Sequence, residues 1–469
     1  MVEQVRAAEA ACAAALPPGS LMQRAATGLA VACAARLGAV YGSRMVLLVG
    51  SGDNGADALW AGARLAARGA AVSAVLTGSP RADALGALLA AGGRVVDAVP
   101  AHGLVVDGLV GIGAKGPLRE AAAALAAAVE GRDVVAVDLP SGVDADTGAV
   151  AGAAVRAALT VTFGTYKPGL LMGAGRTCAG RVELVDIGVA SWLGEPSVEA
   201  LEMPDVARLL PAADASSDKY SRGVVGVAAG SQQYTGAAVL CVGAAVCAGA
   251  GMVRFAGAAH PAEQIRLHWP EAVVHEAEGD DVVGAGRVQA WVVGPGLGTD
   301  GRAEATVEAV LAQDVPVLVD ADALTICARH PQWLRKRTAP TLLTPHDREL
   351  ARFLPLTEDR VGAARQLAQD LGVTVLRKGV ATVVVDGGGP ARVNLTGSPV
   401  LATAGTGDVL SGGCGALLAQ GLSPLDGGSV GAFLHGRAGA LAARGAATSA
   451  GALLATWPDA VREAVRMDP

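Results

Sequence analysis

The chain of 469 residues is 52% hydrophobic and 17% charged, and its formal net charge at pH 7 is −7. This composition excludes an intrinsically disordered chain and supplies enough apolar residues for more than one buried core. Aromatic residues make up only 3% of the chain and basic residues form no block, so we expect neither nucleic acid nor a membrane as a partner.

Strand-like apolar runs alternate with alanine-rich helical runs along almost the whole chain. The apolar runs are 45–49, 71–76, 104–106, 134–137, 159–163, 224–228, 288–293, 315–319, 341–344 and 373–376. Apolar strands separated by helices indicate parallel sheets that are covered on both faces. Because prolines interrupt this alternation between about 190 and 218, we predict an α/β protein of two three-layer αβα domains, 1–200 and 201–469.

A glycine-rich loop follows the first strand and precedes a helix that we expect from about Ala56 to Arg68. It reads Gly50-Ser51-Gly52-Asp53-Asn54-Gly55. Such a loop lets a ligand approach the backbone, and the helix N-terminus favours an anion. A dinucleotide fingerprint would also need an acidic residue about 20 positions later, and the second strand ends without one. The loop therefore predicts a ligand site of another kind.

Oxygen-bearing side chains follow two later strands of the first half. Asp107 comes directly after 104–106, and Asp138 and Ser141 come after 134–137. The carboxyl ends of parallel strands are where open α/β sheets bind ligands. A carboxylate, an amide and a hydroxyl that converge there suit a hard cation or acid–base chemistry. Each residue could instead cap a loop or helix, but three such loops in succession favour a ligand site.

These loops, together with Thr162-Phe163-Gly164-Thr165-Tyr166-Lys167-Pro168-Gly169, resemble the epimerase domain that repairs hydrated NADH and NADPH. The resemblance implies a Rossmann-like fold and a potassium ion held by Asn54, Asp107 and Ser141. It implies that Asp138 handles a proton and that Lys167 assists it. The implied contacts to the hydrate come from Asp53, Asn54, Gly55, Ala56, Asp57, Gly111, Ile112, Gly113, Ala114, Lys115, Gly116, Pro117 and Asp138.

The glycine loop departs from the family pattern, which reads Asn-Asn-Gly-Gly-Asp-Gly. Here the corresponding residues are Asp53-Asn54-Gly55-Ala56-Asp57-Ala58, so two glycines are replaced by alanine. If either position needs a positive φ, alanine there would strain the loop. If the loop were strained in this way, the first domain could be a binding module without catalytic activity.

An uncharged stretch near the start of the second half, 236–253, is apolar enough to suggest a membrane span. Glycines dilute it, however, and neither flank carries an aromatic belt or a cationic cluster. We therefore expect a buried helix of an α/β domain.

The most specific motif of the second half is Leu401-Ala402-Thr403-Ala404-Gly405-Thr406-Gly407-Asp408-Val409-Leu410-Ser411-Gly412, whose glycine-rich turn opens an apolar helix. A glycine-rich turn at a helix N-terminus presents backbone N–H groups to a phosphate. Asp408 beside that turn could deprotonate a hydroxyl that attacks a phosphoryl group. The phrase resembles the signature of ribokinase-like kinases, which predicts a ribokinase-like second domain.

Three further motifs, together with 219–223 and 230–238, resemble the dehydratase domain of the same repair system. These motifs are Gly294–Gly298, Thr344–Glu349 and Lys378–Thr382. Where the family commonly has Pro-Gly after the histidine, this chain has Asp347-Arg348. The resemblance implies that the hydrated nucleotide touches Ala237, Gly298, His346 and Asp408. It implies that ADP touches Lys378, Gly379, Val380, Ala381, Thr382 and Gly407.

Together, the resemblances imply repair of hydrated NADH and NADPH in two steps. The first domain would interconvert the R and S epimers at C6 of the hydrated nicotinamide. The second would phosphorylate the C6 hydroxyl of the S epimer, using ADP or ATP with Mg²⁺, and loss of phosphate would regenerate NAD(P)H. ADP is favoured for bacterial-type domains. A small-molecule kinase with a non-catalytic first domain is the alternative, because the glycine turn is shared.

The cellular setting is read from the cysteines and the N-terminus. The seven cysteines form no Cys-x-x-Cys pair and the N-terminus shows no signal-peptide pattern, so we expect a reducing, cytoplasmic location. A homo-oligomer is possible, and the sequence is silent on the preference between hydrated NADH and NADPH.

Overall fold

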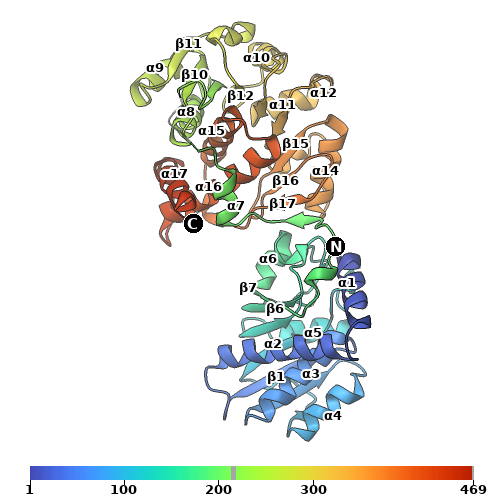
Figure 1. The fold of residues 1–469 in the computed structure, drawn as a ribbon. Helices are drawn as coiled ribbons and strands as arrows, with labels where there is room; N and C mark the ends of the chain where they lie inside the picture. The colour runs from blue at the N-terminus through green and yellow to red at the C-terminus, as the bar shows by residue number, and fades with distance from the viewer. Residues whose placement is uncertain (213–217, 467–469) are drawn as a thin grey trace. The chain divides into compact units, whose positions relative to one another are not determined.

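The computed structural model describes residues 1–212 and 218–466. The chain divides into two compact units, Met1–Pro196 and Ser197–Pro469, each built around its own sheet (Figure 1). We refer to them as the first and the second unit and describe each by itself.

The first unit contains a parallel sheet with the strand order β3-β2-β1-β4-β5-β6-β7. The strands are β1 (Arg44–Val49), β2 (Ala71–Leu76), β3 (Arg94–Val95), β4 (Leu104–Gly108), β5 (Val134–Val137), β6 (Leu159–Phe163) and β7 (Arg181–Val185). The five predicted strands are confirmed. The sequence missed β3 and β7 because both lie at sheet edges, where partly exposed residues leave no continuous apolar run.

Helices cover both faces of this sheet. They are α1 (Val2–Ala14), α2 (Ser20–Leu37), α3 (Asp53–Ala66), α4 (Ala82–Ala90), α5 (Glu120–Ala128), α6 (Gly173–Ala179) and the short 3₁₀ helices Pro168–Leu170 and Ala190–Trp192. Alternate residues of β1 point to opposite faces. Leu47 joins the core under α2 and α3, and Leu48 joins the core under α5. This arrangement is the predicted three-layer architecture.

The second unit contains a larger sheet with the strand order β11-β10-β9-β12-β13-β14-β15-β16-β17-β8. Its strands are β8 (Val198–Glu199), β9 (Val224–Ala228), β10 (Met252–Gly257), β11 (Val273–Glu276), β12 (Ala290–Val293), β13 (Val317–Val319), β14 (Thr341–Leu343), β15 (Thr374–Arg377), β16 (Val383–Val385) and β17 (Ala391–Val393). The expectation of parallel pairing alone is wrong at one end, because β16 runs antiparallel to β15 and β17. The connection Lys378–Thr382 is too short for a helical crossover.

The helices of the second unit are α7 (Met203–Leu209), α8 (Thr235–Cys247), α9 (Ala259–His268), α10 (Gly301–Leu311), α11 (Asp322–Arg329), α12 (Pro331–Arg335), α13 (Asp347–Leu350), α14 (Arg360–Leu371), α15 (Thr406–Ala419), α16 (Pro424–Ala443) and α17 (Ala450–Val465), with 3₁₀ helices at Gly279–Ala285 and Pro399–Leu401. Helices α14 and α16 both contact β15 and β16, and Figure 1 shows them on opposite sides of these strands.

Helix α8 accounts for most of the uncharged stretch 236–253. It ends at Cys247, and the stretch continues into β10. The predicted buried helix is present but shorter than expected, with Ala238, Cys241 and Val242 fully buried. It packs closely on α15, because a Cβ at Gly412 would lie 2.0 Å from the Cys241 carbonyl oxygen. Within the described residues, no helix is long and apolar enough to cross a membrane.

Candidate active sites

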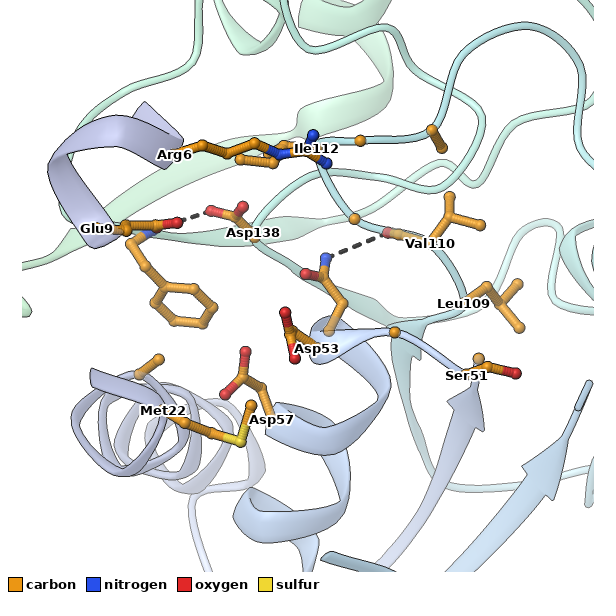
Figure 2. A pocket seen from close by; sticks show the side chains of 18 of the residues that line it. Arg6, Glu9, Met22, Ser51, Asp53, Asp57, Leu109, Val110, Ile112 and Asp138 are labelled. Carbon is orange, nitrogen blue, oxygen red and sulfur yellow. Dashed lines mark hydrogen bonds between the residues drawn. The ribbon is translucent and has the colours of Figure 1, made fainter. Parts of the chain in front are cut away.

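A cavity of about 1240 Å³ opens at the carboxyl ends of β1, β4 and β5 in the first unit, and we call it the first-unit pocket (Figure 2). Helices α1 and α2 contribute to its walls. The predicted contact residues that line it are Asp53, Asn54, Asp57, Asp138, Gly111, Ile112, Gly113, Ala114, Lys115, Gly116 and Pro117. Gly55 and Ala56 are not among the lining residues, because they are buried within α3.

The glycine loop is shorter than predicted, because α3 begins at Asp53 and ends at Ala66. The expected start at Ala56 is therefore wrong by one turn. Ala56 is helical, and the described non-glycine residues with positive φ do not include it. The strain that alanine would cause at a positive φ is therefore absent. Close approach instead explains two glycines, since a Cβ at Gly50 would lie 1.8 Å from the Leu109 carbonyl oxygen and one at Gly55 2.2 Å from that of Gly50.

Asn54 lines the pocket, whereas Asp107 and Ser141 are fully buried, and Val110 joins them because its carbonyl accepts from Asn54 and its N–H donates to Ser141. The Ser141 hydroxyl and backbone N–H donate to the two Asp107 carboxylate oxygens over 2.7 and 2.8 Å. The Asn54 amide donates to the carbonyls of Val110 and Val137 over 3.2 and 2.6 Å. Burial raises the pKa of Asp107, and the hydrogen bonds from Ser141, which carry no positive charge, offset this only partly. Asp107 is thus a buried carboxyl group among neutral donors, and it does not itself line the pocket.

Asp138 and Lys167 form a buried ion pair at the end of β5. The Lys167 ammonium lies 2.5 Å from Asp138 Oδ1 and also donates to the Phe163 carbonyl over 2.8 Å. The Thr162 hydroxyl and the Phe163 N–H donate to the same Asp138 oxygen. Asp138 adopts φ = 63°, a left-handed backbone conformation that residues other than glycine rarely adopt. The backbone and three donors therefore hold this carboxylate at the pocket wall.

Two further carboxyl groups face the first-unit pocket. Asp57 is 6% exposed, and its buried Oδ1 has no hydrogen-bond partner among the described residues. Burial, reinforced by the carboxylates of Asp138 and Asp53, raises its pKa well above the usual value. Glu9 reaches the pocket from α1, and burial raises its pKa as well. The sequence shows no signal for Glu9, because this residue lies on α1 and is far in sequence from every strand end.

In the second unit, Asp408 lies in the first turn of α15, directly after the glycine turn. Gly405 has φ = 86°, which favours glycine. Burial, reinforced by the carboxylate of Asp320, raises the pKa of Asp408 to about 7. A Cβ at Gly407 would lie 3.7 Å from the Lys378 ammonium, so the glycine turn and the loop Lys378–Thr382 are neighbours. A cation thus lies beside the N-terminus of a helix, a combination that suits a phosphate.

Lys378 is held by two carboxylates. Its ammonium lies 2.7 Å from Asp320 Oδ1 and 3.7 Å from a Glu349 oxygen. Burial alone would lower the pKa of Lys378, but Asp320 and Glu349 outweigh it and raise the pKa. The Ser411 hydroxyl of α15 donates to the other Asp320 oxygen over 2.6 Å. Asp320 follows the end of β13, and Ser411 lies one turn after Asp408 on α15; the sequence assigned neither residue a role.

His346 forms the N-cap of α13. Its backbone N–H donates to Glu349 over 2.8 Å, and the Glu349 N–H donates to His346 Nδ1 over 3.2 Å. This reciprocal cap explains why the spacing of the two residues matters. The neighbouring Asp347, where the family has proline, accepts hydrogen bonds from Arg360 and Arg377. Those two arginines outweigh partial burial and lower the pKa of Asp347.

Ala237 and Gly298 lie at the edge of the second sheet where the parallel strands β9 and β12 end. A Cβ at Gly296 would lie 2.8 Å from the Ala237 Cβ, which places the start of α8 against the loop Gly294–Gly298. The Gly298 N–H donates to Asp322 over 2.8 Å, and the Asp322 charge acts on Asp408. In the rest of the predicted nucleotide loop, the Thr382 hydroxyl donates to the Gly379 carbonyl, Ala381 is buried and Val380 is exposed.

Comparisons with known proteins cover both units. Residues 225–457 match a family described as NAD(P)H-hydrate dehydratase, and residues 18–169 match one described as YjeF-related protein N-terminus. The bifunctional NAD(P)H-hydrate repair enzyme Nnr of Mycobacterium tuberculosis is 54% identical over 90% of this chain and 89% of that protein. The enzyme of the same name from Gloeobacter violaceus is 40% identical over 90% of this chain and 89% of its own.

A solved structure resembles the second unit. The ADP/ATP-dependent NAD(P)H-hydrate dehydratase of Bacillus subtilis, co-crystallised with ATP and Mg²⁺, is 27% identical with a TM-score of 0.51. The match covers 58% of this chain and 99% of that protein. A ribokinase-like protein of Enterococcus faecalis, 24% identical with a TM-score of 0.53, shares the fold.

Proposed function

Because the chain belongs to the family of bifunctional NAD(P)H-hydrate repair enzymes, we propose that the first-unit pocket carries the epimerase reaction and that the site around Asp408 carries the dehydratase reaction. The substrates are the R and S hydrates of NADH and NADPH, and the product is the reduced nicotinamide nucleotide. The small-molecule kinase alternative is disfavoured, because relatives that align along most of this chain are bifunctional repair enzymes.

The observation that carries the dehydratase proposal is the position of Asp408 beside the glycine turn and Lys378. Its pKa of about 7 suits a general base near neutral pH. In our proposal, Asp408 takes the proton of the C6 hydroxyl while the oxygen attacks the terminal phosphoryl group of ADP or ATP. The helix N–H groups and Lys378 stabilise the phosphoryl charge. Phosphate then leaves C6 and a proton leaves C5, which restores the double bond.

The nucleotide and Mg²⁺ are proposed partners of the same site. Mg²⁺ in such sites binds largely through the substrate phosphates, so the glycine turn and Lys378, which would hold those phosphates, fit it while Asp408 stays available as the base. When bound, the cation would neutralise phosphoryl charge. The Bacillus subtilis relative was co-crystallised with ATP and Mg²⁺, which supports nucleotide use here without deciding between ADP and ATP.

For the epimerase reaction we assign proton handling at C6 to Asp138 and its support to Lys167. The buried ion pair and the three donors to Asp138 support this assignment, because they hold the carboxylate in one geometry. The loop of residues 111–117 would enclose the nucleotide, since all of these residues line the pocket. Lys167 itself is not at the surface of the pocket and would act through Asp138.

A potassium ion held by Asn54, Asp107 and Ser141 remains a proposal that these residues fit. Their oxygen atoms are ligands that a hard cation accepts, and among the described residues the hydrogen bonds to the buried Asp107 come from neutral donors. When bound, potassium would supply positive charge beside this carboxyl group. The three residues would then tie β4, β5 and the start of α3 together beneath the hydrate.

For the chain as a whole, we propose a cytoplasmic location and assign no oligomeric state.

The test uses the purified full chain with separated R and S hydrates of NADH, ADP or ATP, and Mg²⁺. Recovery of absorbance at the reduced-nicotinamide band reports dehydration of the S hydrate. Recovery from the R hydrate faster than its spontaneous epimerisation reports the first unit. A plateau after the S form is consumed would contradict the epimerase assignment, and no recovery with either nucleotide would contradict the dehydratase assignment.

A further inference from the structure

Glu9 occupies a place in the first-unit pocket that the proposed function leaves unused. Helix α1 packs against its unit through Val2, Val5, Ala8 and Cys12, which recur at helical spacing and are buried. The backbone N–H of Val2 also donates to Asp146 over 2.7 Å. Glu9 lies on the border of this buried face and lines the pocket. The packing of α1 therefore fixes the position of Glu9, which is not a freely moving surface side chain.

The Glu9 carboxyl group points toward Asp138. Figure 2 shows the two side chains facing one another, Glu9 from α1 and Asp138 from the end of β5. The Glu9 side chain is close enough to Asp138 and Lys167 for both charges to act on it. The two carboxyl groups lie far apart in the first unit's sequence, and only the fold brings them together.

The carboxyl groups of the pocket differ in their partners. Glu9, Asp53, Asp57 and Asp138 all line it, but Asp138 is paired with the Lys167 ammonium and Asp53 lies 4.0 Å from the Arg81 guanidinium. Asp57 Oδ1 is buried without a hydrogen-bond partner among the described residues. Burial and the neighbouring carboxylates raise the pKa of both Glu9 and Asp57. A carboxyl group that keeps its proton can act as a donor, while Asp138, which accepts three hydrogen bonds, acts as the acceptor.

We propose that Glu9 is a second catalytic residue of the epimerase, which gives a proton to the C6 hydroxyl while Asp138 takes one from water at the opposite face of C6. The proposal rests on the epimerase function assigned to the first-unit pocket. It adds a residue of α1 to a site otherwise built from strand ends.

The Glu9 O–H transfers its proton to the C6 hydroxyl, the C6–O bond breaks with its electron pair on oxygen, and water leaves. The lone pair on N1 forms an N1=C6 double bond. A water molecule adds to the other face of C6, its surplus proton passes to the Asp138 carboxylate, and the double-bond pair returns to N1. One proton has moved from Glu9 to Asp138, and C6 is inverted.

Two facing carboxyl groups suit a reaction that runs in both directions. The reverse epimerisation follows the same path backwards, so Asp138 becomes the donor and Glu9 the acceptor. Because the two groups face each other in the pocket without substrate, the proton can return between them after product leaves. A single acid–base residue on one face of the ring could not serve both faces of C6.

The decisive variant is Glu9→Gln, which keeps the size of the side chain and removes the acidic proton. We expect kcat for conversion of R to S to fall by about 10²-fold or more, with KM changed by less than about threefold. Dehydration of the S hydrate, measured on the same preparation, should stay normal and shows that the protein is folded. Glu9→Asp should recover part of the rate. Glu3→Gln, an exposed change on the same helix, is the control and should match wild type.

Two readouts separate catalysis from a structural role. The groups facing Glu9 are Arg6, Asp53, Asp57, Asp138 and Lys167. In this setting the wild-type rate should fall as pH rises through the Glu9 pKa, and this decline should vanish in Glu9→Gln. In ¹⁸O-labelled water, wild type should place one label at C6 for each inversion.

Three results would overturn the inference without touching the proposed function. These are wild-type epimerisation by Glu9→Gln, a loss confined to KM, and inversion without ¹⁸O incorporation. Failure of the wild-type chain to epimerise at all would instead overturn the function assigned to the pocket.

Discussion

The Lys378 ammonium lies 2.7 Å from a carboxylate oxygen of Asp320, which is 1% exposed and also accepts a hydrogen bond from Ser411. This contact links the end of β13, the helix α15 and the loop after β15. It places the lysine beside Gly407, where the proposed phosphate would lie. The pair therefore couples the nucleotide loop to the helix that carries Asp408.

Asp320→Asn should weaken nucleotide use more than hydrate use. Loss of the carboxylate leaves Lys378 with Glu349 alone, so the ammonium is both less well positioned and less stabilised. We expect the nucleotide KM to rise and the free energy of unfolding to fall by about 3 kcal/mol, as for other broken buried pairs. Steady-state kinetics with varied ADP or ATP, and urea unfolding, measure these effects. Asp459→Asn, which alters an exposed pair with Arg462, should change neither.

Asp408→Asn should stop dehydration and leave epimerisation intact. Removal of a general base costs about 10²- to 10⁴-fold in kcat. In wild type, kcat for dehydration should fall as pH drops below about 7, because the base becomes protonated. Normal turnover in the variant, measured with the pure S hydrate at saturating nucleotide, would reject Asp408 as the base.

The same carboxyl group should make the second unit less stable as pH rises. Its pKa is raised above the unfolded value of 3.8 to about 7, so the folded chain binds the extra proton between those values. The free energy of unfolding should therefore decrease as pH rises through that window and level off above about 7. Thermal unfolding of wild type and Asp408→Asn across pH 4 to 8 tests this sign, and parallel curves would contradict it.

Asp138→Asn should abolish epimerisation while S-specific dehydration continues. The amide cannot accept the proton, and it leaves the buried Lys167 without its charged partner. We expect the R to S rate to fall to the spontaneous level and the first unit to lose stability. Asp133→Asn, at an exposed pair with Arg36, provides the matched control. Equal epimerisation rates in Asp138→Asn and wild type would remove Asp138 from the mechanism.

Potassium should stabilise the first unit through Asp107. A cation that binds only the folded chain raises its free energy of unfolding by mass action. We expect the midpoint of thermal unfolding to rise in potassium chloride compared with choline chloride at equal ionic strength. Asp107→Asn should lose this difference. The same potassium-dependent rise in wild type and Asp107→Asn would contradict the assignment of Asp107 as a ligand.

Much of the fold could be predicted from local patterns in the sequence. The strands of the first sheet from β1 to β6, apart from β3, are continuous buried runs, and such runs are visible without knowing their neighbours. The edge strand β7 contains no buried residue and therefore shows no such run. The antiparallel β16 was missed for another reason, because its direction depends on the short connection Lys378–Thr382 rather than on its own apolar residues.

For the sites, the sequence alone determined which side chains stand at the strand ends, because a parallel sheet gathers those ends at one edge whatever else the chain does. Asp107 and Asp138 follow from this rule, whereas the glycine turn before Asp408 is recognised by its own motif because it follows the 3₁₀ helix Pro399–Leu401. Only the tertiary structure decided which distant residues join them. Glu9 meets Asp138, and Asp320 meets Lys378, through the packing of helices and loops that lie far apart in the chain. Burial and nearby charge then set the protonation of these groups, and both arise only on folding.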